Sequence, residues 1–254
     1  MKKIYLLLLL LVSIHLSAQL KAVAYNDGDQ KLNGFSIVPT KLGKETKGIL
    51  ILPAWKGIDE HAKESAKKLA ELGYYAFIAD IYGEGNYPKD AAEAGKQAGF
   101  YKQNFKSYQK RISLALEQLI KSGADANKIV VIGYCFGGTG ALEAARSGMP
   151  VKGIVSFHGG LKKDTARTNE PISTKVLVLH GADDPNVPPA EVAAFQQEMN
   201  ESKADWQMVY YANAVHAFTD PYAGNDNSKG AAYNEKADKR SWEHMLTFLK
   251  EVLK

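Results

Sequence analysis

The chain has 254 residues, and its 32 basic residues barely outnumber its 28 acidic ones, which gives a formal net charge of +4. This length and an apolar content of 45% suit one domain with a full hydrophobic core. The near-neutral balance, without a basic stripe interleaved with aromatic residues, argues against a nucleic-acid partner.

The N-terminal segment predicts a secretory signal peptide over residues 1–18. Lys2 and Lys3 precede a leucine-rich run over residues 4–14, and the small residues Ser17 and Ala18 follow. The alternative is a membrane anchor, but the run is shorter than the ~20 residues that a spanning helix needs. We expect cleavage after Ala18, an exported (periplasmic or secreted) protein without stable membrane insertion, and a net charge of about +2 once Lys2 and Lys3 are removed.

Residues 19–254 are predicted to form a single domain in which strands alternate with helices. The expected strands are 20–26 and 32–39, which form a hairpin, and then 48–52, 75–80, 128–132, 151–157, 175–180 and 206–211. The expected helices are 60–72 with Asp59 as cap, 90–121 with an interruption near Gly99, 139–145, and 236–253 with an apolar stripe at Trp242, Met245, Leu246, Leu249 and Val252. This alternation predicts an α/β fold with a mostly parallel, doubly wound sheet and helices on both faces.

The most informative segment is Gly133-Tyr134-Cys135-Phe136-Gly137-Gly138, between an apolar strand and a helix. It has the G-x-S-x-G form of a nucleophile elbow, with cysteine in the place of serine. The alternative is a glycine-rich turn around a buried structural cysteine. Cys135 is the only cysteine, so an exported protein would carry it as a reactive thiol or as an intermolecular partner. Its position at an elbow favours the reactive thiol.

Downstream residues supply the partners that such a thiol needs. Two carboxylates, Asp183 and Asp184, follow the strand 175–180, and His216 follows the strand 206–211. Residues at the carboxyl ends of parallel strands meet at one edge of the sheet. The order nucleophile, acid, histidine is the order found in α/β-hydrolases, and it favours a catalytic triad over a merely solvated histidine.

These residues resemble the dienelactone hydrolase family, a branch of the α/β-hydrolases. The matching segments are residues 79–85, 133–138, 157–161, 184–188 and 216–218. The resemblance implies an α/β-hydrolase fold over nearly all of the chain after the N-terminal segment. It implies Cys135 as nucleophile, His216 as base and Asp184, three residues before Val-Pro, as the orienting acid.

The resemblance also implies an oxyanion hole. The backbone N–H groups of Phe136 and Trp55 are its expected donors. The chain differs from the family pattern at two positions. The family prototype carries a Glu after the strand 48–52 and an Arg after residues 79–82, where this chain has Ala54 and Glu84. These departures argue against the dienelactone itself as substrate and leave the triad in place.

Three further residues are candidates for contact with substrate, namely Tyr82, Tyr134 and His158. His61, His180 and His244 are expected to pack or to face solvent. The sequence has no zinc-ligand spacing, phosphate-binding loop or dinucleotide fingerprint, so no metal or cofactor is expected.

The sequence therefore predicts an exported hydrolase, a monomer or small homo-oligomer, that cleaves a small carboxylic ester or lactone. The main alternative is a binding protein on a hydrolase scaffold, with little or no turnover. Thiol peroxidase chemistry is disfavoured because no resolving cysteine is available.

Overall fold

The computed structural model describes residues 19–40, 43 and 45–254, so the expected signal peptide lies outside the described residues. The strands are β1 (Lys21–Asp27), β2 (Gln30–Ile37), β3 (Gly48–Leu52), β4 (Tyr75–Ile78), β5 (Ile129–Tyr134), β6 (Gly153–Phe157), β7 (Lys175–Gly181) and β8 (Trp206–Tyr211). The helices are α1 (Glu60–Glu71), α2 (Ala91–Gln103), α3 (Phe105–Lys121), α4 (Phe136–Arg146), α5 (Pro189–Glu201), α6 (Glu235–Val252) and the short 3-10 helix η1 (Asn227–Lys229).

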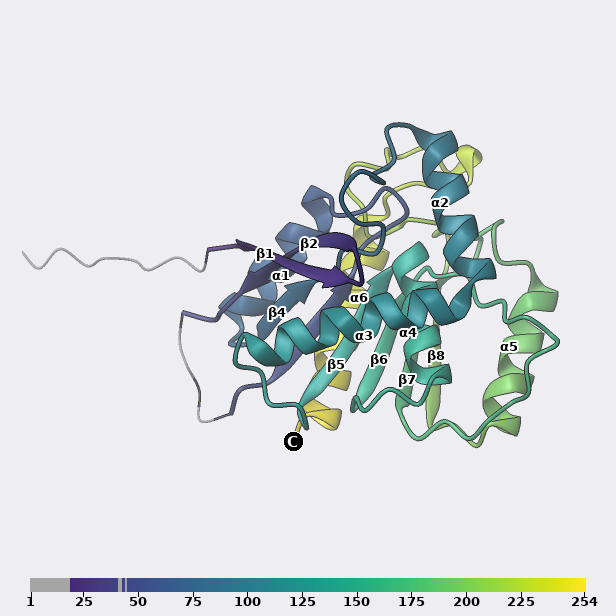
Figure 1. Cartoon of the computed structure of the whole chain (residues 1–254). Coiled ribbons are helices and arrows are strands. Elements are labelled where there is room, and N and C mark those ends of the chain that lie inside the picture. Colours follow the sequence, from purple (N-terminus) through teal and green to yellow (C-terminus); the bar gives the residue numbers. More distant parts are fainter. Residues whose placement is uncertain (1–18, 41–42, 44) are drawn as a thin grey trace, which may run out of the picture.

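The eight strands form one sheet in the order β1-β2-β4-β3-β5-β6-β7-β8 (Figure 1). The hairpin β1–β2 is antiparallel and joins β4 antiparallel, whereas every pair from β4 to β8 is parallel. β5 lies at the centre of the parallel part. β8 pairs with β7 alone and is largely half-exposed. The predicted α/β-hydrolase fold, a mostly parallel sheet, is confirmed.

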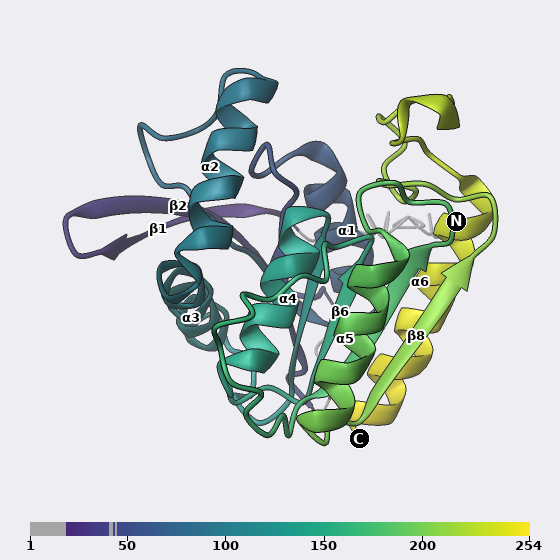
Figure 2. The same cartoon turned by 90° about the vertical axis from the view of Figure 1, so that its right-hand side faces the viewer.

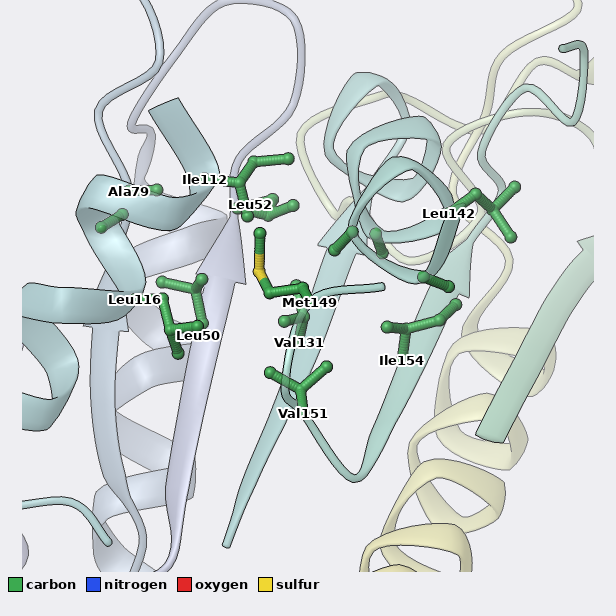
Figure 3. Close-up of a cluster of buried hydrophobic side chains, with 14 of the residues drawn as sticks. Leu50, Leu52, Ala79, Ile112, Leu116, Val131, Leu142, Met149, Val151 and Ile154 are labelled. Atoms are coloured by element: carbon green, nitrogen blue, oxygen red, sulfur yellow. The ribbon is translucent and has the colours of Figure 1, made fainter. Parts of the chain in front are cut away.

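Helices cover both faces of the sheet, as the continuous apolar strands require. Helices α3, α4 and α5 pack on one face, and α1 and α6 pack on the other (Figure 2). Between α3, α4 and the sheet lies a core of aliphatic side chains (Figure 3). It includes Leu50 and Leu52 from β3, Val131 from β5, and Ile112 and Leu116 from α3. This packing fixes β5, and therefore the turn that follows it.

The helical region 90–121 breaks at a different residue from the one expected. Gly99 lies inside α2, and the chain divides at Asn104. A glycine costs a helix only about 1 kcal/mol, and the buried residues Ala98 and Tyr101 hold this part of α2 against the core. Asn104 ends the helix because its backbone N–H and its side-chain amide both donate to the carbonyl of Phe100, at 2.8 and 2.9 Å.

The apolar stripe of the last helix packs against the core as expected and includes one further residue. Met245 and Leu249 are buried as expected, but Phe248 is buried as well. Trp242 is only half-buried, and its ring lies 5.6 Å from the Lys68 ammonium. Trp242, Leu246 and Val252 are partly buried against the same core, so all five expected residues face it. Within the described part of the chain, no helix is long and apolar enough to cross a membrane.

Candidate active site

Cys135 occupies a strained turn between β5 and α4. Its backbone angles are φ 53° and ψ −114°, a left-handed conformation that is unusual for a residue other than glycine. The turn is held because Cys135 N–H donates to the carbonyl of Phe157 at 3.0 Å and its own carbonyl accepts from Thr139 N–H at 3.2 Å. Such strain, retained by surrounding structure, is typical of functional sites.

Glycines around Cys135 permit a close approach of backbone segments. A Cβ at Gly133 would overlap the carbonyl of Gly137, and a Cβ at Gly137 would overlap the carbonyl of Leu52 on β3. Neither glycine has a positive φ, so the requirement is for space and not for a special backbone angle. The elbow is thus packed directly against the strand that leads to Trp55.

We expect Gly137→Ala to destabilise the protein strongly, because the clash is with backbone atoms that cannot rotate away. The loss of unfolding free energy should reach or exceed the upper end of the ~1–3 kcal/mol that overpacking costs. Gly99→Ala is the control, since nothing lies within 4 Å of the added Cβ and the change should stabilise α2 by ~0.5–1 kcal/mol. Urea unfolding measures both. A Gly137→Ala protein as stable as the wild type would contradict this packing.

Three side chains from the ends of three strands meet in a line. His216 Nδ1 lies 2.9 Å from Asp184 Oδ2, and His216 Nε2 lies 3.0 Å from Cys135 Sγ. The Asp184 side chain is fully buried, and its Oδ1 accepts the N–H of Asn186 at 2.9 Å. Asp183 is exposed and does not take this place. The arrangement is that of a nucleophile, a base and an orienting carboxylate.

The loop that carries His216 is fixed by its own backbone contacts. His216 N–H donates to the carbonyl of Gly230 at 3.2 Å, and its carbonyl accepts from Ala232 N–H at 3.0 Å. The next residue, Ala217, has φ 57°, and Phe218 is fully buried below the loop. The imidazole is therefore held in place from β8 and from the segment after η1.

The charges of Cys135 and His216 favour a thiolate–imidazolium pair. Burial opposes ionisation of the thiol, but the hydrogen bond and charge of His216 hold the pKa of Cys135 below its usual value, helped by Phe136 N–H and Lys102. Burial alone would lower the pKa of His216, but Asp184 and Cys135 raise it to about 10. These shifts move the proton that the two groups share from the thiol toward His216.

We expect Cys135 to react with iodoacetamide in the free protein with an apparent thiol pKa below the ~8.5 of free cysteine. The pH dependence of the alkylation rate measures it. His216→Ala should slow alkylation near neutral pH, because burial then acts on the thiol without its cationic partner. Lys102→Met should also raise the thiol pKa, but by less than His216→Ala does. A thiol that is no more reactive than free cysteine and indifferent to His216 would contradict this charge state.

The two expected oxyanion donors flank Cys135. Phe136 is the first residue of α4, and Trp55 follows the end of β3. Among the residues that the structure describes, no backbone carbonyl outside α4 accepts a hydrogen bond from the N–H of Phe136, and no loop carbonyl accepts one from the N–H of Trp55. Both residues line the same cleft as Cys135. The N-terminus of α4 adds the positive end of a helix dipole at the sulfur.

The cleft above Cys135 has a volume of about 810 Å³, which is room for a small to medium-sized ligand. Of the three predicted substrate contacts, Tyr134 and His158 line this cleft and Tyr82 does not. Tyr82 is instead buried, with its hydroxyl directed at the carbonyl of Trp55. His158 has φ 40°, and its Nε2 lies 2.8 Å from Thr219 Oγ1.

Several cleft residues were not found from the sequence. His61, expected to be structural or solvated, lines the cleft, and its ring lies 4.5 Å from that of Tyr134. Lys102 reaches the cleft from α2, and Asp59 and Asp220 line it from the side of His61. Asp59 therefore lines the cleft and also caps α1, where its side chain accepts the N–H of Ala62. No sequence motif marked these residues, because separate helices and loops bring them to the cleft.

The two departures from the family pattern lie in different surroundings. Ala54 lines the same cleft as Cys135, with a small apolar side chain. Glu84 is exposed at the side of β2, where its N–H donates to the carbonyl of Lys31 at 2.8 Å. Within the described ranges, no group of three or more His, Cys, Asp or Glu side chains could hold a metal ion.

This fold, with a thiol elbow and an Asp–His pair at the carboxyl edge of the sheet, is that of an α/β-hydrolase. The model of the dienelactone hydrolase family matches residues 32–253, and the chain belongs to that family. The family and its named relatives make it an ester or lactone hydrolase.

Solved structures and a curated relative agree with this assignment. The structure of m3DLH is 34% identical, has a TM-score of 0.88, and covers 94% of this chain and 100% of its own. A dienelactone hydrolase-like promiscuous phosphotriesterase from metagenomic libraries is 36% identical, with a TM-score of 0.87 and the same coverage. A probable 2-oxo-3-(5-oxofuran-2-ylidene)propanoate lactonase of Bradyrhizobium sp is 27% identical over 80% of this chain and 82% of its own.

Proposed function

We propose that the protein is an exported hydrolase that cleaves a carboxylic ester or lactone with Cys135 as the nucleophile. The observation that carries the proposal is the line from Asp184 through His216 to Cys135, with contacts of 2.9 and 3.0 Å. Family membership supports the reaction class, and the leucine-rich N-terminal run supports export.

The thiolate of Cys135 attacks the carbonyl carbon, and the electron pair of the C=O bond moves to oxygen. The N–H groups of Phe136 and Trp55 stabilise that oxyanion, and removal of one such donor typically costs ~100- to 1,000-fold in kcat. As the oxyanion collapses, the C–O bond breaks and His216 Nε2 gives its proton to the leaving alkoxide.

The product of that step is a thioester on Cys135 and a neutral His216. His216 then takes a proton from water as the water oxygen attacks the thioester carbon. The second tetrahedral intermediate expels the Cys135 thiolate and releases the carboxylic acid, which restores the thiolate–imidazolium pair. In a lactone the leaving oxygen stays attached to the acyl chain, so one hydroxy acid is released.

The charge state of the free protein distinguishes this proposal from activation by substrate. Ala54 stands where the family prototype has a Glu that takes part in thiol activation. The lowered pKa of Cys135 and the raised pKa of His216 supply the activation here without that carboxylate. The thiol should therefore be ready before substrate binds.

A panel of p-nitrophenyl esters, simple lactones and dienelactone tests the proposal on the chain from Gln19 onward. Because one neighbour is a promiscuous phosphotriesterase, the triester paraoxon belongs in the panel. We expect ester or lactone turnover, and an acyl group on the Cys135 peptide in mass spectra of acid-quenched samples. Binding without turnover or acylation would favour a binding protein on a hydrolase scaffold.

Export is tested separately with the full chain expressed in a bacterium that processes secretory signals. We expect the protein in the periplasm or medium with Gln19 as its first residue. An unprocessed chain in the cytoplasm would contradict the proposed export and would leave the proposed chemistry unaffected.

A further inference from the structure

Trp55 and Phe136, the two residues that are expected to form the oxyanion hole, each accept a hydrogen bond from a tyrosine hydroxyl at the backbone carbonyl. The hydroxyl of Tyr82 donates to the carbonyl of Trp55 at 2.6 Å, and the hydroxyl of Tyr108 donates to the carbonyl of Phe136 at 3.0 Å. Both tyrosines are at most 2% exposed. Each oxyanion residue is thus held at its carbonyl by a buried side chain, while its N–H is directed elsewhere.

The aromatic rings of Tyr82, Phe136 and Tyr108 form a continuous stack. The Phe136 ring lies 5.8 Å from that of Tyr82 at an interplanar angle of 17°, and 4.6 Å from that of Tyr108 at 5°. Tyr101 on α2 packs against both tyrosines, with ring centroids 5.9 and 5.8 Å away. Offset stacking of this kind restricts the rings in position and tilt. The stack therefore holds both tyrosine hydroxyls in place.

Tyr82 is fixed at its backbone by a buried carboxylate. Asp80 is 2% exposed, and its Oδ1 accepts the N–H groups of Tyr82 and Gly83 at 3.1 and 2.9 Å. Its Oδ2 accepts the N–H of Asn33 and the hydroxyl of Tyr87, both at 2.8 Å. A buried carboxylate with four donors forms a rigid anchor. Asp80 therefore places Tyr82 against the loop that carries Trp55.

Tyr108 reaches Phe136 across the contact between α3 and α4, and a glycine makes room for it. A Cβ at Gly140 would overlap the Tyr108 hydroxyl. Burial raises the pKa of Tyr82 and Tyr108 above the ordinary value of 10, and the nearby charge of Cys135 raises it further. Both hydroxyls therefore remain protonated and can donate.

We propose that Tyr82 and Tyr108 are positioning residues that orient the Trp55 and Phe136 N–H groups toward the oxyanion. The N–H of a residue lies in the peptide plane before its Cα and its carbonyl lies in the plane after it, so a bond to the carbonyl holds the backbone on one side of the donor and limits how far the N–H can turn. Donors held in place before reaction need no reorganisation when the charge develops. This inference rests on the proposed function. It adds which side chains orient the two N–H donors of the oxyanion hole.

Tyr82→Phe and Tyr108→Phe test the inference, because each removes one hydroxyl and keeps the ring. Tyr211→Phe is the control: Tyr211 is also a buried residue with a hydrogen-bonded hydroxyl, but its partner is His244 Nδ1 at 2.7 Å, and neither residue lines the cleft. Three readouts are needed. These are kcat and KM for p-nitrophenyl acetate, inhibition by an alkyl trifluoromethyl ketone, and the rate of Cys135 alkylation by iodoacetamide.

The ketone forms a tetrahedral oxyanion on the thiol, whereas alkylation displaces iodide and forms none. We expect both tyrosine variants to lose about 10- to 100-fold in kcat/KM, mainly in kcat, since a misplacement of ~1 Å can cost ~100-fold. Ketone inhibition should weaken by a similar factor. Alkylation should stay within about twofold of the wild-type rate, because it needs the thiolate but not the oxyanion hole. Tyr211→Phe should change none of the three.

Wild-type turnover and ketone inhibition in both tyrosine variants, with Cys135→Ala inactive, would overturn this inference and leave the nucleophile in place. An equal loss of turnover and alkylation would also overturn it, because that result means a general structural defect. Turnover retained by Cys135→Ala would overturn the proposed nucleophile and this inference together.

Discussion

Cys135→Ala should abolish ester and lactone hydrolysis while the protein remains folded. The change removes only the sulfur, which faces the cleft, and retains the Cβ at the elbow. By analogy with other triads, we expect kcat to fall by a factor on the order of 10⁴ or more. Steady-state hydrolysis of p-nitrophenyl acetate measures the loss, and thermal unfolding followed by circular dichroism measures the fold.

Cys135→Ser and Ser147→Ala are useful companions to this variant. A serine hydroxyl keeps the elbow but forms no ion pair with His216, so Cys135→Ser should retain at most weak activity. Ser147 lies just after α4, the helix that begins after Cys135, and its hydroxyl bonds the carbonyl of Ala144 at 2.8 Å. Ser147→Ala should keep full activity. Unchanged turnover in Cys135→Ala would rule out the thiol mechanism.

Asp184→Asn should cost far more activity than Asp183→Asn. An amide in place of the Asp184 carboxylate no longer stabilises the His216 imidazolium and favours the wrong imidazole tautomer, which in a comparable triad costs ~10⁴-fold in kcat. Asp183 is exposed, and its backbone N–H donates to the carbonyl of Ala214 at 3.0 Å. We expect Asp183→Asn to change kcat by no more than about twofold, as is usual for exposed positions.

A second measurement checks the reason for that difference. The carboxylate of Asp184 raises the pKa of His216, and His216 in turn lowers the pKa of Cys135. Asp184→Asn should therefore also slow alkylation of Cys135 near neutral pH, and Asp183→Asn should not. If Asp183→Asn had the larger effect on either rate, the assignment of the orienting carboxylate would be wrong.

The sequence predicts the strands and the elbow well because their signals are local. The apolar runs at β3, β5 and β7 are fully or almost fully buried strands, as their composition indicates. Asp59 accepts the N–H of Ala62 and begins α1 as expected of a capping residue. Helix α5 was not predicted, since only two of its apolar side chains, Phe195 and Met199, are buried, and they give a weak helical pattern.

The site is predictable only where one residue and its strand end define the position. Cys135, Asp184 and His216 follow β5, β7 and β8, so strand order alone brings them to one edge. Tyr82 was expected at the cleft, but burial places its hydroxyl on a backbone carbonyl instead. His61 gave no signal because its approach to Tyr134 depends on how α1 packs against the sheet. A strand end can be recognised from the local sequence, whereas contacts that depend on tertiary packing cannot.

The position of β8 at the end of the sheet makes the general base the least protected part of the active centre. His216 lies on the loop after β8, which is the outermost strand, whereas Cys135 directly follows β5 in the interior of the sheet. Partial opening at a sheet margin requires less free energy than global unfolding. Loss of the β7–β8 contact would withdraw the imidazole and leave a thiol without its proton acceptor. In a urea titration, hydrolytic activity should therefore disappear at a lower denaturant concentration than the helical ellipticity does. At intermediate urea the protein would be folded but inactive.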